Sequence, residues 1–291
     1  MNTSKINTLT RIISCVFFAY IYVGQVNSES FHIIIPADVK QDYLRFLDGR
    51  DPLSIHDFDS KHARRDVVEV VLLEQALSLG GNQDSYKILT GTSTATNTHR
   101  LEVGSVEIIG TSVWKSMFSD QSKILFSSAM IENGRFVSGL YTSPHNQHML
   151  SVKTKQDLKD KSAISSRMWS VDWKTLPTLN LSKIWHTDQW KKMVEMVNNQ
   201  QVDFLIAPFQ SSSDLALVIN GVRLIPVPGV KVIFHGTRHF AVSKTAKNGE
   251  KLLEYINNGI SQLQAQNMIE KAYNQAGFYN HQVKDWQQLN D

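Results

Sequence analysis

The sequence has almost no cysteine: Cys15 is the only one among 291 residues, and it lies near the N-terminus. The residues around it have the features of a secretory signal peptide, with basic Lys5 and Arg11 before an apolar run over residues 12–23. We therefore predict that residues 1–28 are a cleaved signal peptide and that the mature protein is exported to the periplasm. An uncleaved membrane anchor is the alternative, although about twelve apolar residues are few for a bilayer span.

Other absences in the predicted mature chain exclude further classes of function. Without cysteine, the chain has no disulfide, no thiolate nucleophile and no cysteine-ligated zinc. No later hydrophobic run is long enough to cross a membrane. Once Lys5 and Arg11 are removed, 28 basic residues remain against 27 acidic residues, a net charge of about +1, and no basic stripe is interleaved with aromatic residues. We therefore expect no nucleic-acid partner.

Motifs for catalysis and cofactor binding are also missing. The chain contains no G-x-S-x-G elbow, no P-loop, no G-x-G-x-x-G and no H-E-x-x-H. His145 and His148 lie in a polar stretch that lacks the third ligand of a metal site. The sequence therefore predicts no catalytic residues, no cofactor and no metal.

The clearest structural pattern runs from Thr187 to Pro208. Apolar residues recur at helical spacing over residues 190–197 and predict an amphipathic helix. Residues 202–207 then form a nearly continuous apolar run, typical of a strand buried on both faces, and Pro208 ends it. A helix that leads into a buried strand is half of a β-α-β unit, so we predict a largely parallel sheet.

A similar pattern occurs earlier, over residues 98–111. A short helix ends at Gly104, and an apolar strand containing Glu107 follows; Asp203 has the corresponding position in the later copy. We expect each of these two carboxylates to be bonded to a neighbouring backbone group or lysine. Two copies about a hundred residues apart indicate two similar α/β lobes rather than one large sheet.

Polar stretches that follow predicted strands are candidate binding loops, because ligands of open α/β sheets bind beyond the carboxyl ends of the strands. Residues 31–35 predict the first strand, and residues 37–65 an irregular polar loop at its end. A helix is predicted over residues 66–79. Further polar loops are predicted at residues 110–114 and 166–170.

Short motifs in a fixed order connect these segments. They are the helix at 66–81, RLEVGSVEII at 100–109, ILFS at 124–127, QDLKDK at 156–161, QQVDF at 200–204 and the closing segment at 257–279. In order and spacing the chain resembles the type II periplasmic solute-binding proteins, specifically the family-3 group that contains the amino-acid receptors of ABC importers. The resemblance spans nearly all of residues 31–279.

This resemblance implies the architecture. It implies an α/β, two-lobed periplasmic-binding-protein-like (type II) fold, in which each lobe is a mostly parallel sheet flanked by helices and two crossings form a hinge. Lobe I would comprise residues 29–137 and 235–291, and lobe II residues 138–234. The ligand would bind in the cleft between the lobes, held by strand-end loops and helix N-termini, and closure of the lobes would trap it.

Two residues that anchor amino acids in that family have no counterpart here. The family places an arginine before the ILFS position to bind the ligand carboxylate with two hydrogen bonds, but residues 114–121 contain no arginine. The family's aspartate that pairs with the ligand ammonium is replaced by Pro208. An ordinary amino acid is therefore not the expected ligand.

Other side chains of the strand-end loops offer hydroxyl groups, one guanidinium group beside a predicted helix N-terminus, and two indole rings for stacking. They suit a small polar or anionic solute. The candidate ligand-binding residues are Thr111, Ser112, Trp114, Ser166, Arg167, Trp169 and Ser170. In the alternative interpretation, Arg167 is a solvated turn residue and both tryptophans pack under the hinge.

We predict a monomeric, exported solute-binding protein without catalytic activity that delivers its ligand to a membrane permease or a sensor. The main alternative is a protein of the same fold that has no transport role and acts as an interaction or signalling module, which the two missing anchors favour. A more distant alternative is an enzyme on the same scaffold, as in the dehydratase relatives of the fold.

Overall fold

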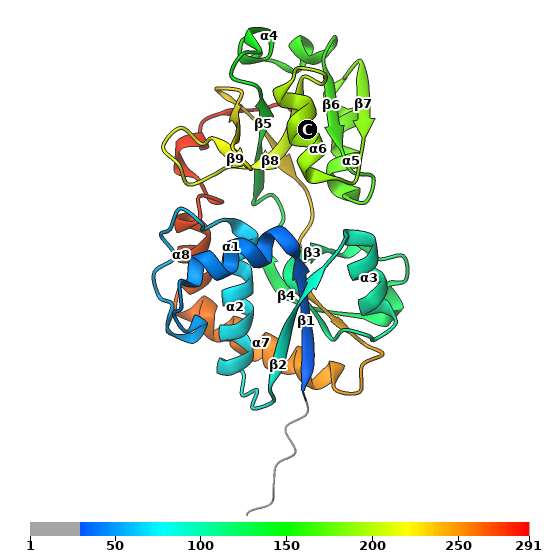
Figure 1. The fold of residues 1–291 in the computed structure, drawn as a ribbon, viewed down its shortest axis with the longest axis vertical. Coiled ribbons are helices and arrows are strands. Elements are labelled where there is room, and N and C mark those ends of the chain that lie inside the picture. Colours follow the sequence, from blue (N-terminus) through cyan, green and yellow to red (C-terminus); the bar gives the residue numbers. More distant parts are fainter. Residues whose placement is uncertain (1–29, 291) are drawn as a thin grey trace, which may run out of the picture.

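The chain forms two lobes stacked along its long axis in a computed structural model that describes residues 30–290 (Figure 1). Lobe I contains a five-stranded sheet in the order β2-β1-β3-β12-β4. Lobe II contains an eight-stranded sheet whose main path is β13-β11-β5-β8-β6-β7, with β10 paired to β5 and β9 paired to β10. The predicted signal peptide lies outside the described residues.

The two lobes take their elements from alternating stretches of the chain. Those of lobe I are β1 (Phe31–Pro36), α1 (Ala37–Leu47), η1 (Pro52–Ser54), α2 (Arg65–Leu79), β2 (Tyr86–Gly91), α3 (Thr94–Glu102), β3 (Ile108–Trp114), η2 (Lys115–Met117), η3 (Gln121–Lys123), β4 (Ile124–Ile131), β12 (Arg238–Ser243), α7 (Gly249–Ala265) and α8 (Met268–Gln275). Those of lobe II are β5 (Phe136–Thr142), α4 (Gln147–Leu150), η4 (Lys155–Leu158), β6 (Ser162–Ser165), α5 (Ser170–Thr175), η5 (Leu176–Leu179), β7 (Lys183–His186), α6 (Trp190–Asn198), β8 (Phe204–Pro208), β9 (Leu217–Ile219), β10 (Val222–Pro226), β11 (Val230–Phe234), η6 (His281–Val283) and β13 (Gln287–Gln288).

Each lobe is built on a parallel three-stranded unit. In lobe I, β1 is parallel to β2 and β3, and in lobe II, β6 is parallel to β7 and β8. The strand that follows each of the crossings β4–β5 and β11–β12 runs the other way: β12 is antiparallel to β3 and β4, and β5 is antiparallel to β8 and β11. The two-lobed α/β class is confirmed, and the predicted parallel pairing is found within the three-stranded units.

The carboxylates of Glu107 and Asp203 fasten equivalent strand pairs in the two lobes. Glu107 precedes β3, and its Oε2 accepts a hydrogen bond of 2.7 Å from the backbone N–H of His32 in β1. Asp203 precedes β8, and its Oδ2 accepts a hydrogen bond of 2.7 Å from the backbone N–H of Ser162 at the start of β6. The expected structural role of both residues is therefore confirmed.

The helix α2 is buried on all sides. Residues 67–77 are each at most 5 % exposed, and the helix packs against α7 and against the sheet. Gly259 of α7 permits this close approach, because a Cβ there would lie 1.9 Å from the carbonyl oxygen of Ala76. Burying a Val or Leu side chain stabilises the fold by about 1.5–3 kcal/mol. The first residue of α2, Arg65, is therefore held firmly on the side of lobe I that meets lobe II.

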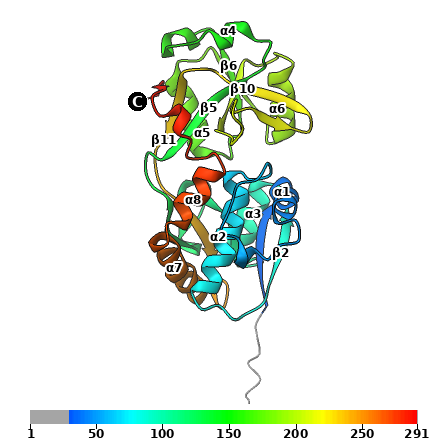
Figure 2. The ribbon, with the colours of Figure 1, turned by 90° about the vertical axis from the view of Figure 1, so that its left-hand side faces the viewer.

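Three segments pass between the lobes. Residues 132–135 link β4 to β5 and residues 235–237 link β11 to β12, as the two predicted crossings do. Residues 276–280 form a third crossing, because η6 and β13 follow α8 and β13 pairs with β11 of lobe II (Figure 2). The structure thus differs from the predicted lobe boundaries at the C-terminus. A two-residue strand carries no periodicity from which the sequence could have revealed it.

Residues 280–290, named the C-terminal strap below, are fixed to lobe II by side chains as well. The amide of Asn290 donates a hydrogen bond of 2.8 Å to the carbonyl oxygen of Ile233, and its Oδ1 accepts one of 2.9 Å from the N–H of the same residue. Lys231 Nζ donates to the carbonyl oxygens of Val283 and Lys284 at 2.9 and 2.6 Å. The strap therefore adds hydrogen bonds along one edge of the lobe II sheet.

Two stretches predicted as loops are regular structure. Residues 37–47 form the helix α1, whose apolar side chains face the core while charged residues between them obscure the helical period. Residues 110–114 continue β3 to its end at Trp114, where the strand pairs with β12 at Arg238. The predicted binding loop after β3 is therefore a strand that leads directly to the hinge.

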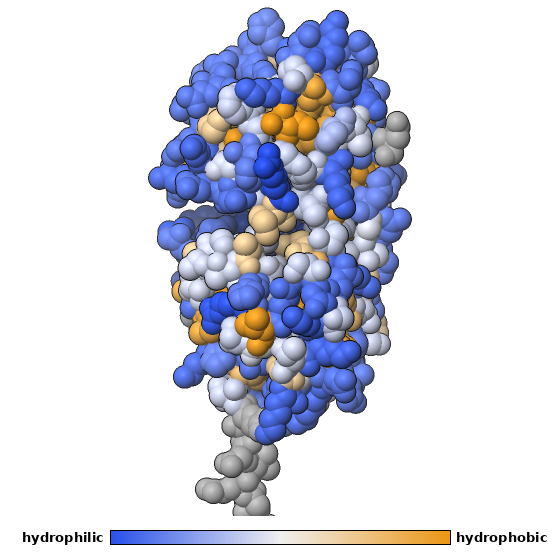
Figure 3. Space-filling model, turned by 90° about the vertical axis from the view of Figure 1, so that its right-hand side faces the viewer, coloured by the Kyte–Doolittle hydropathy of each residue, from blue (hydrophilic) through white to orange (hydrophobic). Residues whose placement is uncertain are grey.

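The surface of the molecule is mostly hydrophilic, and its apolar patches are scattered (Figure 3). The waist between the lobes is hollowed on one side in this view. Exposed large hydrophobic residues come from separate elements: Leu44, Leu53, Leu79, Val103, Trp185 and Val218. Within residues 30–290, no helix combines the length and the hydrophobicity needed to cross a bilayer.

Candidate functional site

The lobe I side of the interlobe region is formed by α2, β3 and β12. Arg65 begins α2, Ser112 lies in β3 and Arg238 begins β12. Arg238 Nε donates a hydrogen bond of 3.0 Å to Ser112 Oγ, and its Nη2 donates to the carbonyl oxygen of Ser112. Arg65 Nη1 lies 3.5 Å from the same Oγ. Ser112 therefore brings two guanidinium groups together.

Glu69, one turn after Arg65 in α2, compensates part of this positive charge. Its Oε2 accepts hydrogen bonds from Arg65 Nη1 at 2.7 Å and from the backbone N–H of Ser112 at 2.8 Å. Its Oε1 accepts from Ser112 Oγ at 2.6 Å and from the Tyr273 hydroxyl at 3.0 Å. A carboxylate has about four lone-pair sites, so this fully buried side chain is saturated as an acceptor.

The guanidinium group of Arg238 is buried over aromatic rings. It lies 5.0 Å from the ring centroid of Trp114 and 5.3 Å from that of Phe136. Burial, together with the positive charge of Arg65, lowers the pKa of Arg238 to about 9. A lowered arginine pKa means that the surroundings disfavour the charged form. An anion beside Arg238 would stabilise it.

Lobe II approaches this pair through the short helix α5. Ser170 Oγ, at the start of α5, lies 2.8 Å from Ser116 Oγ of η2, a hydrogen bond that joins the two lobes. Asp172, in the first turn of α5, is half-buried. Burial raises the pKa of Asp172 to about 6, although the two arginines act in the opposite direction.

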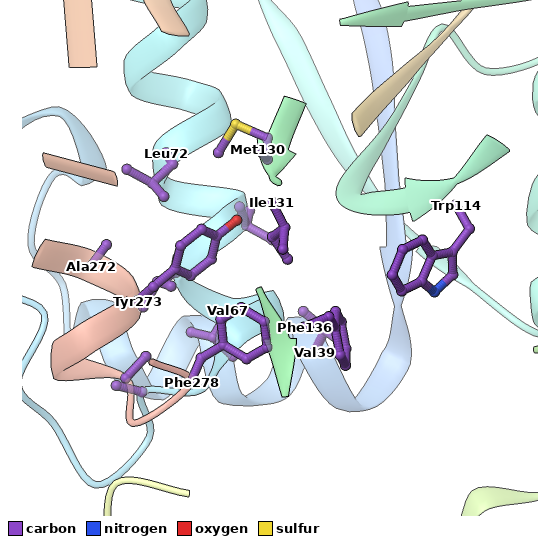
Figure 4. Close-up of a cluster of buried hydrophobic side chains, with 14 of the residues drawn as sticks. Val39, Val67, Leu72, Trp114, Met130, Ile131, Phe136, Ala272, Tyr273 and Phe278 are labelled. Carbon is purple, nitrogen blue, oxygen red and sulfur yellow. The ribbon is translucent and has the colours of Figure 1, made fainter. Parts of the chain in front are cut away.

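Trp114 is packed at the hinge. Its ring centroid lies 5.4 Å from that of Phe136, at the start of β5, and 6.5 Å from that of Phe234, at the end of β11. Phe136 in turn contacts Phe278 at 5.0 Å, so that it lies between Trp114 and the aromatic residues after α8 (Figure 4). The floor of the interlobe region is therefore aromatic, with the guanidinium of Arg238 above it.

The structure places the three lobe I candidates on one strand. Thr111, Ser112 and Trp114 all lie in β3 and are buried, with Ser112 completely inaccessible and Trp114 only 4 % exposed. Ser112 and Trp114 contact Arg238, whereas no such contact is seen for Thr111. Ser112 and Trp114 thus lie beside Arg238, which is not among the candidates predicted from the sequence.

The four lobe II candidates point in different directions. Ser166 is buried and donates a hydrogen bond to Asp188 Oδ1. Arg167 is exposed, and its guanidinium lies 5.4 Å from the ring of Trp173. Trp169 packs on Trp190 at 5.9 Å within lobe II. Ser170 reaches across to lobe I, as described above. Among these candidates, Ser170 has a hydrogen bond to lobe I.

Sequence reasoning missed the four charged residues of the interlobe site, Arg65, Glu69, Asp172 and Arg238. The position of Glu69 could have been noticed in the sequence, because it is an acid within the apolar run VVEVV of a helix buried on all sides. The position of Arg238 is a weaker indication, since it is a basic residue directly before the apolar strand HFAVS. Their meeting depends on strand pairing between residues more than a hundred positions apart, which local patterns do not contain.

Comparisons with known proteins place this geometry in context. No family model matches the sequence, and no curated protein matches it. Solved structures do match. The BvgS periplasmic VFT2 domain of Bordetella pertussis superimposes with a TM-score of 0.55 at 13 % identity, over 84 % of this chain and 92 % of that one. The chain has the two-lobed fold of type II periplasmic binding proteins.

Two further structures share this fold. One is ytmK, a probable amino-acid ABC transporter extracellular-binding protein of Bacillus subtilis, with a TM-score of 0.55 at 13 % identity over 85 % of this chain and 97 % of that one. The other is the ancestral amino-acid-binding protein AncCDT-1, a precursor of cyclohexadienyl dehydratase, with a TM-score of 0.52 at 14 % identity over 85 % and 95 %. Identities this low establish the fold alone.

Proposed function

We propose that the protein is an exported two-lobed receptor that binds a small anionic solute, such as a carboxylate, between its lobes. The observation that carries this proposal is the buried pair of guanidinium groups of Arg65 and Arg238, held at Ser112. Like charges in a buried site are unfavourable, and strongly shifted pKa values cluster at functional sites. A bound anion would stabilise the charged form of Arg238, which burial and the charge of Arg65 disfavour, and both arginines could donate to it.

The fold supports this location. In α/β sheets, ligands bind beyond the carboxyl ends of strands and at domain interfaces, and β3 ends at Trp114 in the interlobe region. Of the residues proposed from the sequence, Ser112 and Trp114 would form the lobe I wall and Ser170 part of the lobe II wall. The protein would then deliver its solute to a membrane permease or a sensor in the periplasm, as the names of similar folds suggest.

We infer binding rather than catalysis from the state of the buried carboxylate. Glu69 accepts hydrogen bonds from four donors, so it has no free lone pair with which to take a proton from a substrate. The similarity to a precursor of a dehydratase concerns the scaffold. A catalytic role would require an acid or base with freedom to exchange protons with the substrate. Among the charged residues described above, Asp172, whose pKa burial raises to about 6, is the one that could supply it.

A second candidate function is an interaction or signalling module without a solute. Trp114 favours it, because this side chain fills the floor of the interlobe region against Phe136 and Phe234. The Ser116–Ser170 hydrogen bond favours it too, since it joins the lobes directly. In that case the arrangement with the lobes joined by this hydrogen bond would itself be the functional state.

A thermal-shift screen of residues 29–291 tests the proposal. The panel contains carboxylates, amino acids, polyamines, nucleosides and short peptides. A ligand at a hundred times its dissociation constant stabilises the folded state by about 2.7 kcal/mol, which raises the melting temperature by several degrees. We expect a carboxylate to give the shift, Arg238→Met to abolish it and Arg167→Met, which removes an exposed arginine of lobe II, to leave it unchanged.

Other outcomes of this screen would contradict the proposal. If the rise in melting temperature persisted in Arg238→Met but disappeared in Arg167→Met, the anion site would lie in lobe II instead. If no compound of the panel raised the melting temperature of a well-folded wild-type protein, the interaction module would be favoured.

A further inference from the structure

Side chains of the turn between β4 and β5 tie the three crossings of the hinge together. Asn133 Oδ1 accepts a hydrogen bond of 2.7 Å from the N–H of Gly236, which lies in the crossing between β11 and β12. The guanidinium group of Arg135 lies over the ring of Tyr279, 3.9 Å from its centroid, in the crossing that follows α8. A single turn therefore contacts both of the other connections between the lobes.

Arg135 also fixes this turn to lobe I. Its Nη1 and Nη2 donate hydrogen bonds of 3.0 and 2.9 Å to the two carboxylate oxygens of Glu270, in the first turn of α8. A bidentate pair fixes the orientation of the guanidinium group as well as its distance, and the ring of Tyr279 adds a cation–π attraction. Arg135, Glu270 and Tyr279 are named the hinge clasp below.

The ion pair of the hinge clasp spans the points at which the crossings can bend. Gly134 and Gly277 have positive φ angles of 78° and 73°, a conformation that glycine adopts without steric cost. Hinge motions change the backbone angles of a few such residues. Arg135 and Tyr279 follow these glycines and would move with lobe II, whereas Glu270 precedes Gly277 and stays with lobe I. Rotation of the lobes about the glycines would therefore separate Arg135 from Glu270.

The exposure of this ion pair limits its strength. The side chains of Arg135 and Glu270 are 45 % and 38 % exposed. Ion pairs at such positions are weak, and dissolved salt screens them. The hinge clasp can therefore change the ratio of open to joined molecules by about two- to fivefold, and less at high ionic strength.

We propose that Arg135 is a positioning residue of the hinge, whose ion pair with Glu270 holds the lobes together and releases them as the ionic strength rises. The consequence for binding rests on the proposed function above. A solute would reach Arg65 and Arg238 only while the lobes are open, so its rate of association follows the fraction of open molecules. The hinge clasp thus regulates access to the interlobe site.

The distance between two spin labels tests the hinge clasp. Residues 29–291 contain no cysteine, so Lys87→Cys in lobe I and Lys159→Cys in lobe II, both at exposed positions, give the two labelling sites. Pulsed electron paramagnetic resonance then reports the distribution of distances between the lobes. We expect the ratio of long to short distances to be about two- to fivefold higher at about 1 M than at about 0.1 M sodium chloride.

Two variants in this labelled background separate the hinge clasp from other effects of salt. Glu270→Gln removes the ion pair and leaves Arg135 over Tyr279, so it should have the larger long-distance population at both salt concentrations, without salt dependence. Arg223→Met is the matched control, because it removes an exposed arginine whose partner, Asp214, lies in the same lobe. This control should behave like the wild type. A salt dependence that persists in Glu270→Gln, or equal distributions for Glu270→Gln and the wild type, would overturn the hinge clasp.

Stopped-flow mixing with pyruvate, followed by tryptophan fluorescence, tests the consequence for binding. Glu270→Gln should associate about two- to fivefold faster than the wild type at about 0.1 M sodium chloride, in proportion to its open fraction. Equal rates despite different distance distributions would overturn the control of access. If the distances respond as expected but neither pyruvate nor another carboxylate of the thermal-shift panel binds, the hinge clasp stands and the anion site falls.

Discussion

Glu69 is the residue on which the charge balance of the interlobe region depends. It is fully buried, accepts four hydrogen bonds and faces two arginines. Its replacement by glutamine would remove the fully buried counter-charge of Arg65 and leave Asp66, 3.8 Å from Arg65 Nη2, as the remaining ion-pair partner. Breaking a buried ion pair by removing one partner typically destabilises a protein by about 3–5 kcal/mol, because the remaining charge is uncompensated.

We therefore expect Glu69→Gln to lower the free energy of unfolding by about 3 kcal/mol in urea denaturation. The matched control is Glu270→Gln, which removes a carboxylate bonded to both Nη atoms of Arg135 on the surface. Exposed ion pairs contribute about 0–1 kcal/mol, so the control should change little. Equal effects of the two substitutions would show that burial of the arginine pair carries no energetic cost.

At the same scale, the structure brings only some of the candidate residues together. Ser112 and Trp114, predicted from a polar stretch that follows an apolar run, contact Arg238. Arg167, predicted from its place at a strand-to-helix junction, is exposed on lobe II. Arg238 lies beside Ser112 only because β12 pairs with β3, a long-range contact that no local pattern encodes.

Among the secondary-structure elements, those with strong periodicity were predictable. The amphipathic α6, the buried β8 and the apolar α2 agree with the predicted ranges, since burial on one face or on all sides leaves a clear pattern. The helix α1 was missed because charged side chains separate its apolar residues. The helix α5, which positions Asp172, has only six residues, too few for a helical period to be seen.

The equivalent carboxylates of the two lobes provide a test at this scale. Asp203 accepts hydrogen bonds from the N–H and Oγ of Ser162 at 2.7 and 2.8 Å, which fixes β6 beside β8. Asp203→Ala leaves these half-buried donors without a partner, at a cost of about 1–3 kcal/mol. We expect faster amide hydrogen exchange in β6 and unchanged exchange in lobe I.

Glu107→Ala should give the reciprocal result. Glu107 bonds the N–H of His32 in β1, so the faster exchange should then be confined to the lobe I sheet. If either substitution accelerated exchange equally in both lobes, the two sheets would not be independent folding units.

The C-terminal strap changes the behaviour expected of the whole molecule. A hinge with two crossings lets the lobes rotate about the connecting strands, whereas the strap adds a third connection that is paired with β11 and bonded through Asn290 and Lys231. Opening of the lobes must therefore deform residues 276–280 or detach the strap.

Removal of residues 281–291 tests this role of the strap. Without them, Lys231 and Ile233 lose their partners, and we expect faster amide exchange in β11 and a larger radius of gyration in solution scattering. Asn290→Ala is the milder comparison, since it removes two hydrogen bonds worth about 0.5–1.5 kcal/mol each and leaves the rest of the strap in place. An unchanged radius of gyration after truncation would mean that the two predicted crossings alone set the distance between the lobes.

Because the strap ends on lobe II, the two ends of the described chain lie in different lobes. Strand β1, whose first residue is Phe31, starts at the end of lobe I that is remote from lobe II (Figure 1). Asn290 is bonded to Ile233 of β11 in lobe II. A donor fluorophore near residue 31 and an acceptor near residue 290 would therefore report the separation of the lobes by energy transfer. Neither dye would need to enter the interlobe site.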